Sequence, residues 1–312
     1  MKENTKYEKF CELLLEEVKR EISPEYLVEI HDVVKNNGIH LDSLTIRGED
    51  QRVSPNFYLE NFYQDYCGGS SIAEIAKDIV RLYWDSVKEC EGLALDFSFD
   101  SCRERIVLRL ASGVWNQAIL DKVPNIPFMD MVILFYVVVR VDEDGIGSVR
   151  VSNQLMEKWE ISTESLFRRA LENSKKLFPG KIGSLLDVLR ERISVGEQEE
   201  FPLLFEREFR EGYESPFVIT NTYGINGATA ILYPETLRQM GKKFGKDYFL
   251  LPSSIHEFLA VPSSPGISGD ELKYMVKQVN STCVAKEELL SEKVYYYNVE
   301  SEKISVWGQN TL

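Results

Sequence analysis

Residues 131–139 read MVILFYVVV, the longest apolar run in the chain. Nine residues are too few to cross a bilayer as a helix, but they suit a strand in the interior of a sheet. A strand with water on one face would place a polar side chain at every second position, and this run has none. The stretch therefore predicts a central strand with apolar layers on both sides.

A hairpin pattern precedes this run in the N-terminal third of the chain. Tyr26–Val34 and Ile39–Ile46 are two β-rich segments joined through the sequence KNNG. The dipeptide Asn37-Gly38 favours the positive φ angles of a two-residue type I′ turn. In that register Lys35 pairs with His40, and we expect the two segments to form an antiparallel hairpin.

The remaining segments alternate between strand pairs and helices. An apolar stripe from Tyr7 to Ile22 predicts the first helix, and Ser54-Pro55 predicts the start of another that ends near Tyr66. Periodicity predicts further helices at 72–83, 153–159, 162–178, 184–193, 234–245 and 268–279. Strands are expected at 105–110, 148–152, 217–222, 228–233, 248–251, 255–261, 294–297 and 304–307.

This order of elements predicts an α+β fold, with antiparallel hairpin-built sheets and helices packed between strand pairs, because no repeating βαβ unit is present. The pattern loosens around Glu91–Asp100. We therefore expect an N-terminal helix–hairpin–helix–helix unit over 1–95 and a C-terminal α+β domain over 96–312. A polar stretch makes 194–214 a candidate sub-boundary.

The charge balance restricts the partners that the protein can attract. The formal net charge is −14, and the first 100 residues hold 21 acidic and 11 basic side chains. A negative field repels the phosphates of nucleic acids and of anionic membranes. We therefore expect no nucleic-acid partner and no membrane partner, whereas a basic protein or a cationic ligand would be attracted.

Cysteine usage and the start of the chain bear on location and on metals. The cysteine count is five, and no pair has the C-x-x-C spacing, so neither a disulfide framework nor a zinc site is expected. The first residues lack the apolar core of a signal peptide. These features indicate reduced thiols in the cytoplasm, with no metal and no cofactor.

His256 is the strongest candidate for a catalytic residue, since the chain has only three histidines and this one follows Ser253 and Ser254 and precedes Glu257. A Ser-His-acid set can carry nucleophilic catalysis. In a strand, however, Glu257 would point away from His256 and could not orient the ring. The chain also lacks a Gly-x-Ser-x-Gly elbow. We therefore expect the ring to anchor a turn at Pro252–Ser254.

Several motifs occur in an order shared with one family. They are KNNG at 35–38 with LTI at 44–46, Ser54-Pro55 with Tyr58-Leu59, Val123-Pro124, Ala170 with Asn173, and LLPSSIHE at 250–257 followed by FLAVP. Over nearly its whole length the chain resembles an uncharacterised bacterial family, a domain of unknown function typical of anaerobic gut bacteria. The helix of Ala170 and the final strand–helix–hairpin unit resemble a second uncharacterised bacterial family more weakly. The resemblance implies a bacterial cytosolic setting and an α+β fold, and it implies no mechanism.

Two functions from different classes remain open at this point. The first is a cytosolic, non-enzymatic binding or regulatory protein whose partner is an unknown protein or small molecule. The alternative is a hydrolase or transferase that uses His256 with Ser253 or Ser254. The surroundings of His256 distinguish them, because catalysis needs a serine hydroxyl within hydrogen-bond reach of the ring.

Overall fold

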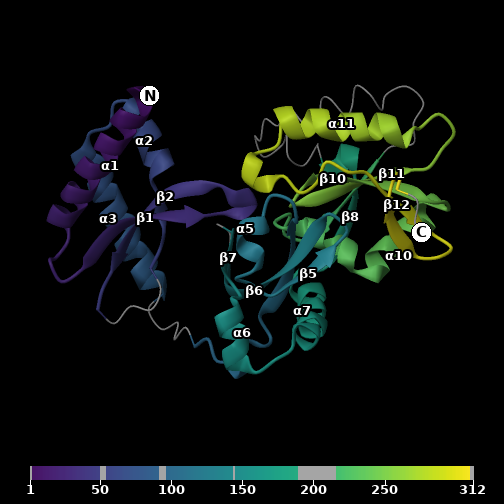
Figure 1. The fold of residues 1–312 in the computed structure, drawn as a ribbon, viewed down its shortest axis with the longest axis horizontal. Coiled ribbons are helices and arrows are strands. Elements are labelled where there is room, and N and C mark those ends of the chain that lie inside the picture. The colour runs from purple at the N-terminus through teal and green to yellow at the C-terminus, as the bar shows by residue number, and fades with distance from the viewer. Residues whose placement is uncertain (1, 50–53, 91–95, 143–144, 189–215, 310–312) are drawn as a thin grey trace. The chain divides into compact units, whose positions relative to one another are not determined.

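The chain forms two compact units, Met1–Asp96 and Phe97–Leu312 (Figure 1). Within the ranges given below, no helix is long and apolar enough to cross a membrane. The computed structural model describes residues 2–49, 54–90, 96–142, 145–188 and 216–309.

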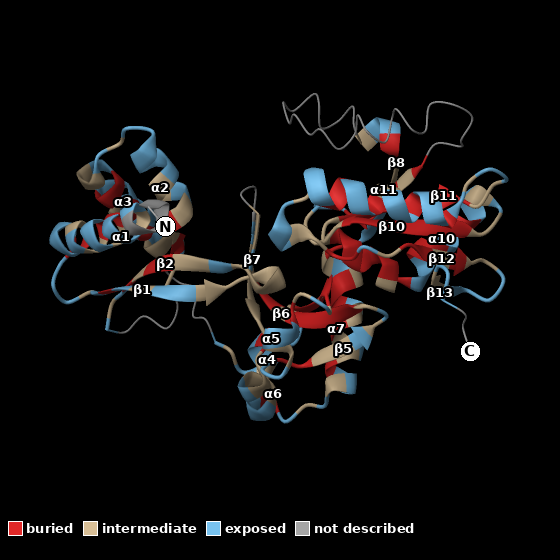
Figure 2. Cartoon of the chain, turned by 45° about the horizontal axis from the view of Figure 1, so that its top comes forward, coloured by how far each residue is buried: buried red, intermediate tan, exposed pale blue. Residues whose placement is uncertain are grey.

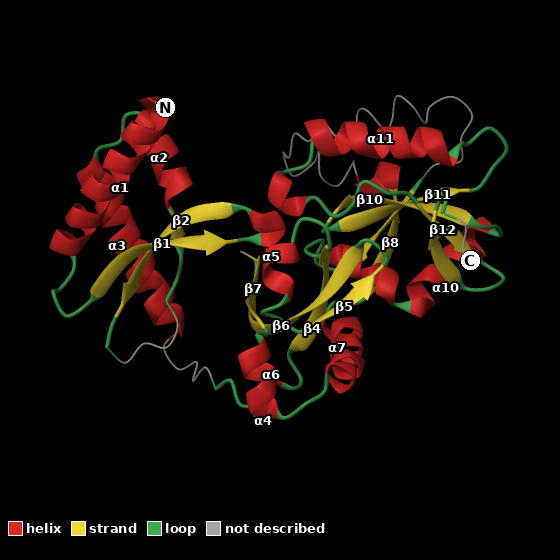
Figure 3. Cartoon of the chain, in the orientation of Figure 1, coloured by secondary structure: helices red, strands yellow, loops and turns green. Residues whose placement is uncertain are grey.

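The N-terminal unit packs three helices on a three-stranded antiparallel sheet with the strand order β1-β2-β3 (Figure 3). Its core joins Leu14 and Val18 of α1, Ile79 and Tyr83 of α3, and Leu44 of β2, all of which are fully buried. The elements are α1 (Lys2–Glu21), β1 (Leu27–Val34), the short 3₁₀ helix η1 (Asn36–Gly38), β2 (His40–Arg47), β3 (Phe57–Tyr58), α2 (Leu59–Cys67) and α3 (Ile72–Cys90).

The expected hairpin forms, but its loop is longer than the sequence indicates. β1 and β2 pair antiparallel, with Val34 opposite His40. Asn37 and Gly38 do take positive φ angles of 59° and 66°, yet they lie inside η1 and not in a two-residue turn. The predicted pairing of Lys35 with His40 is therefore wrong by one residue.

The helix expected to begin at Ser54-Pro55 begins later. Phe57 and Tyr58 are extended and pair with Leu44 and Ser43 of β2, so that they complete the small sheet as β3. The helix α2 starts only at Leu59. Burial of Phe57 in the core outweighs the local preference for a helix start, because tertiary packing overrides propensity.

The C-terminal unit contains a four-stranded and a six-stranded antiparallel sheet (Figure 3), so the α+β prediction is confirmed. In the first, β6 lies between β4 and the strands β5 and β7; in the second, the order is β13-β12-β10-β11-β9-β8. Its first elements are α4 (Phe99–Cys102), β4 (Ile106–Ser112), α5 (Gln117–Leu120), β5 (Asn125–Phe128), β6 (Met131–Asp142), β7 (Gly145–Arg150), α6 (Asn153–Trp159), α7 (Thr163–Leu177) and β8 (Gly180–Ser184). The later ones are β9 (Phe217–Asn221), η2 (Gly227–Leu232), α10 (Pro234–Phe244), β10 (Tyr248–Ser254), β11 (Glu257–Pro262), α11 (Gly269–Thr282), η3 (Lys286–Glu288), β12 (Tyr295–Asn298) and β13 (Lys303–Val306).

Two apolar layers cover the faces of these sheets, as the buried residues in Figure 2 show. One face of β6, with Ile133 and Phe135, shares a large cluster with Leu250 and Phe258 of the six-stranded sheet. The other face of that sheet packs on Val276 and its neighbours in α11. The predicted central strand is confirmed, since the second face of β6 is also covered by a smaller cluster.

The outer edge of β4 is closed by side chains and not by another strand. The Leu108 N–H donates to Ser174 Oγ at 2.8 Å, and the Leu110 N–H donates to Thr229 Oγ1 at 3.2 Å. Ser174 belongs to α7 and Thr229 to η2. Both N–H groups are buried, where a missing partner would cost free energy, so these hydroxyls complete the sheet.

Four expectations about the C-terminal unit were wrong or lie outside the described residues. The strand expected at 228–233 is replaced by η2 (Gly227–Leu232), because a short buried apolar run does not distinguish a strand from a helix. β10 continues through Ser254, with a bulge near Pro252, so the turn falls on Ile255 and His256. The end of the expected helix 184–193 and the candidate boundary at 194–214 lie in the range that the structure does not describe.

Leu134→Ala tests the double burial of β6. Leu134 is 1% exposed and packs in the smaller cluster, so the truncation should lower the free energy of unfolding by about 2–5 kcal/mol. Val141→Ala in the same strand, at 39% exposed, should change it by less than about 1 kcal/mol. Chemical denaturation of both variants measures the difference, and equal values would show that Leu134 does not lie in a packed core.

Candidate functional site

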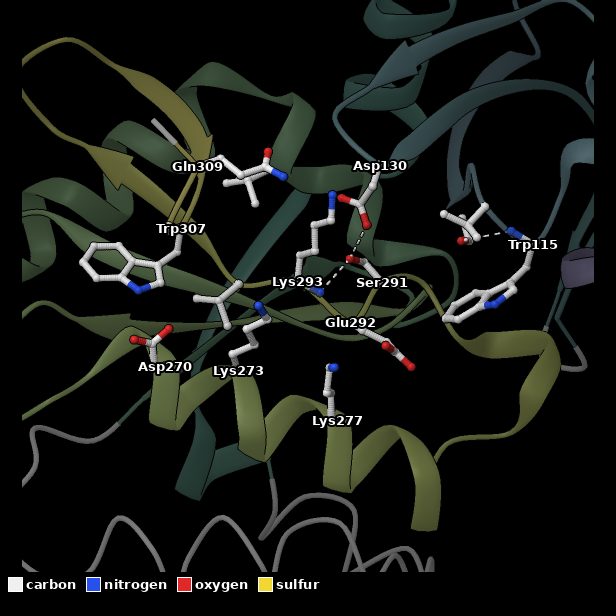
Figure 4. A pocket seen from close by; sticks show the side chains of 15 residues that line it. Trp115, Asp130, Asp270, Lys273, Lys277, Ser291, Glu292, Lys293, Trp307 and Gln309 are labelled. Carbon is white, nitrogen blue, oxygen red and sulfur yellow. Dashed lines mark hydrogen bonds between the residues drawn. The ribbon is translucent and has the colours of Figure 1, made fainter. Parts of the chain in front are cut away.

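A pocket of about 500 Å³ opens on the C-terminal unit (Figure 4). Its walls come from segments that are far apart in the chain: α11, the segment Ser291–Val294 that leads into β12, the end of β13, and the loop after β4. Asp130, one residue before β6, lies at its inner side. A volume of this size fits a small metabolite.

The helix α11 presents one acidic and two basic side chains to this pocket. Asp270, Lys273 and Lys277 follow one another at three- and four-residue spacing, which places them on one face of the helix. The adjoining face carries Leu272 and Val276, which are buried on the six-stranded sheet. The apolar stripe therefore holds the helix down and aims the charged face at the pocket.

The pocket contains charges of both signs. The cationic side chains are Lys273, Lys277 and Lys293, and the anionic ones are Asp130, Asp270 and Glu292. Within the described residues, none of the six forms an ion pair, and the three ammonium groups have no protein hydrogen-bond acceptor. These groups are therefore available to a ligand.

A hydrogen-bonded cluster fixes the inner carboxylate. Asp130 Oδ1 accepts from the Tyr295 hydroxyl at 2.6 Å, and Asp130 Oδ2 accepts from the Ser291 hydroxyl at 2.7 Å. Burial, and to a smaller degree the charge of Asp130, raises the pKa of Tyr295, so its hydroxyl keeps its proton. Because Ser291 and Tyr295 are themselves buried, the carboxylate is held in one position.

Two tryptophans lie at opposite ends of the pocket, with the lysines between them (Figure 4). Trp307 packs edge-on against Phe249, with ring centroids 5.1 Å apart, and it lies so close to α11 that a Cβ on Gly269 would come within 2.2 Å of its Nε1. Glycine is therefore required at position 269 for this packing. Trp115 follows β4 and is half-buried.

The residues that line this pocket can bind charged groups and flat or apolar groups of a ligand. Lysine ammonium groups bind carboxylates or phosphates, carboxylates bind amines, and indole rings bind apolar or aromatic groups. Among the residues whose placement is described, no cluster of His, Cys, Asp or Glu is suited to hold a metal ion.

His256 lies elsewhere, in the turn between β10 and β11. Its Nδ1 accepts a hydrogen bond from the Asn226 N–H at 3.0 Å, and its Nε2 lies 3.3 Å from Glu288 Oε1. Since Nδ1 acts as an acceptor, the proton of the neutral ring is on Nε2 and faces Glu288. Both ring nitrogens are thus engaged by the fold.

The other predicted site residues do not assemble around this ring. The Ser254 hydroxyl accepts from the backbone N–H of His256 at 3.0 Å, and the Ser253 hydroxyl donates to Glu257 Oε1 at 3.3 Å. Neither hydroxyl is hydrogen-bonded to the His256 ring. The acid that contacts the ring is Glu288 and not Glu257. The structure therefore does not bring these residues together as a nucleophile and a base.

A comparison with protein families identifies the family of this chain. The model of the family of unknown function DUF5688 matches residues 7–299. The chain belongs to this family. No curated protein and no solved structure matches it. Since DUF5688 has no assigned activity, the function of this member has to be argued from its own geometry.

Sequence reasoning did not find the pocket of this DUF5688 protein. One local signal existed, since Lys273 and Lys277 lie four residues apart on the polar face of a predicted helix. The inner part of the pocket has no such local signal, because Asp130 and Ser291, which are hydrogen-bonded to each other, are 161 residues apart in the sequence. Only the fold brings these side chains together.

His256→Ala and His256→Asn test whether the ring holds the turn of this DUF5688 protein. The alanine variant leaves the Asn226 N–H without its acceptor and should lower the free energy of unfolding by about 1–3 kcal/mol. Asparagine can place its Oδ1 near the position of Nδ1 and should recover most of this loss. Chemical denaturation measures both. An alanine variant as stable as the wild type, combined with labelling of wild-type Ser253 or Ser254 by a fluorophosphonate, would instead favour catalysis.

Glu288→Gln tests the same contact through pH. The hydrogen bond from the His256 ring holds the pKa of Glu288 below its usual value of 4.5, although burial opposes this. A carboxyl group whose pKa is lower in the folded than in the unfolded protein stabilises the fold at a pH above its unfolded-state pKa. This stabilisation is lost as the pH falls through the folded-state pKa. Below about pH 4.5, the wild type should therefore lose stability more steeply than Glu288→Gln in thermal scans. Glu271→Gln, an exposed residue of α11, should follow the wild type.

Proposed function

We propose that the protein is a non-enzymatic binding protein whose C-terminal unit holds a small zwitterionic molecule, such as a free amino acid or a short peptide. The observation that carries this proposal is that unpaired charges of both signs line one pocket. The sizes agree as well, since about 500 Å³ matches the range of small-molecule sites.

The balance of charge favours a zwitterion over a simple anion or cation. Three lysines and three carboxylates face the pocket, so its lining is close to neutral. The three carboxylates of the lining would repel a strongly anionic ligand in this pocket. A molecule with one ammonium and one carboxylate can satisfy Asp130 and a lysine together without leaving an unmatched charge.

The tryptophans support a ligand that also has an apolar part. Trp115 and Trp307 offer flat surfaces at the two ends, and an indole ring gains free energy by covering apolar groups. We therefore expect the side chain of the bound amino acid or peptide to be apolar or aromatic and to contact one of these rings.

The hydroxyls near the pocket support binding over catalysis. Ser291 Oγ already donates to Asp130 and accepts from the Lys293 backbone N–H at 2.9 Å. The raised pKa of Tyr295 keeps that phenol protonated. A nucleophile needs a base that can take its proton, and Ser291 is bonded to a carboxylate whose two oxygens each accept a hydroxyl proton.

The cysteines are the basis for proposing that the protein acts in the bacterial cytoplasm. In the described part of the chain, Cys11, Cys67, Cys102 and Cys283 form no disulfide. Thiols persist in reducing compartments, whereas secreted proteins usually pair them.

Ligand binding to the wild type and to a pocket variant tests this function. The twenty free amino acids and a set of dipeptides would be screened by thermal shift, with tryptophan fluorescence and calorimetry on the hits. We expect a saturable shift with apolar or aromatic members. Lys273→Gln with Lys277→Gln should weaken binding by about tenfold or more, roughly 1.4 kcal/mol, without changing the melting temperature of the free protein, because both lysines are exposed.

The control variant combines Lys242→Gln with Lys303→Gln, two exposed lysines of α10 and β13 that do not line the pocket. It should bind like the wild type. Binding of N-acetylated amino acids as strong as that of the free ones would contradict a zwitterion site, and unchanged binding by the pocket variant would show that the ligand lies elsewhere.

A further inference from the structure

A second group of cations lies on the four-stranded sheet, on the face opposite the large core. Arg109 of β4 is opposite Leu134 of β6, and Arg150 of β7 is opposite Tyr136 of β6. Directly opposite residues of an antiparallel pair point to the same face. Leu134 and Tyr136, two residues apart in one strand, also share that face, so both arginines lie on it.

The two guanidinium groups share one tyrosine. The Arg109 guanidinium lies 4.3 Å from the centre of the Tyr136 ring, and Arg150 Nε donates to the Tyr136 hydroxyl at 3.0 Å. Arg109 Nη2 also donates to Ser148 Oγ at 2.7 Å. Ser148 lies opposite Val138 of β6 and two residues before Arg150 in β7, so the side chains of Ser148 and Arg150 are on the same face. These contacts fix both side chains over the same part of the sheet.

The charges of this pair are not neutralised by the protein. Over the ranges that the structure describes, neither Arg109 nor Arg150 forms an ion pair, and Ser148 and Tyr136 are their acceptors. Most of their N–H donors therefore have no protein acceptor, since each guanidinium carries five. Both side chains are half-buried, where two like charges without a counter-ion cost free energy.

The pKa of Arg109 agrees with this arrangement. Burial lowers it below the usual value, and the charge of Arg150 lowers it further, while Tyr136 opposes both effects. An external anion would remove the repulsion and supply acceptors to the unused donors. Guanidinium groups match the oxygens of phosphate in pairs, and two arginines balance the two charges of a phosphate dianion.

We propose that Arg109, Arg150, Ser148 and Tyr136 form a binding site for a phosphate dianion, either free or as the phosphate group of a small ester. The site is independent of the zwitterion pocket and stands or falls separately. Ser148 and Tyr136 position the arginines, and the arginines bind the anion.

Titration with inorganic phosphate and with glycerol phosphate at pH 8, against chloride of equal ionic strength, tests the site. The NMR signals of the arginine side-chain N–H groups report whether the anion binds at Arg109 and Arg150. We expect the Arg109 and Arg150 signals to shift and saturate, and the melting temperature to rise with phosphate as mass action requires. A stronger response to the ester would identify the ester as the ligand, and equal responses would identify the phosphate group as sufficient.

Arg150→Gln should weaken phosphate binding at least tenfold, and Arg150→Lys, which keeps the charge but loses the paired donors, should lie between it and the wild type. Arg168→Gln is the matched control, since Arg168 is exposed and paired with Glu164 on α7. The melting temperature in chloride shows that each variant is folded. An equal rise in the wild type and in Arg150→Gln, or arginine signals that do not move, would overturn the site.

The pocket variant Lys273→Gln with Lys277→Gln separates this inference from the proposed function. It should bind phosphate like the wild type, while Arg150→Gln should bind the zwitterion like the wild type. Loss of phosphate binding in the lysine variant would assign the phosphate to the pocket and overturn the arginine site.

Discussion

Burial of β6 on both faces is the constraint on which the C-terminal unit depends. Ile133 and Phe135 enter the large core that the two sheets share, and Val132 and Leu134 enter a smaller cluster on the other side. A strand fixed in this way cannot shift its register, because a one-residue slip would exchange the two sets of side chains. Both proposed sites depend on it: Asp130 immediately precedes β6, and Tyr136 lies within it.

The proposed sites differ from the rest of the surface in how their charges are arranged. Several basic side chains elsewhere pair with acids of the same helix, as Arg20 does with Glu17 and Arg81 with Asp78. Such exposed pairs contribute little to stability, but they show that local partners are abundant in an acidic chain. At the pocket and on the sheet face, several charges that form no ion pair lie close together, and both sites belong to the unit that follows the acidic N-terminal part.

The sequence was informative where a structure is determined by its own residues. The central strand, the antiparallel hairpin pairing and the helix predicted at 72–83 depend on local composition, periodicity and turn chemistry. β8 could not be predicted, because its sequence GKIGS has weak strand propensity and it forms only by pairing with β9. Gly180 in that strand also leaves room for Thr236 of α10, a requirement that appears only after folding. The pocket and the arginine pair were missed for the same reason, since each brings together side chains of elements that only the fold places side by side.

The ribosome adds the two hydroxyl groups that close the edge of β4 long after it has synthesised β4. Ser174, the acceptor for the Leu108 N–H, follows 66 residues later, and Thr229, the acceptor for the Leu110 N–H, follows 119 residues later. At about 5–20 residues per second on the ribosome, the edge of a nascent β4 stays open for roughly 6–24 s before Thr229 is even synthesised. During that time the strand presents free N–H groups to neighbouring chains on the same messenger, so the order of translation exposes this edge to misassembly that the finished protein no longer allows.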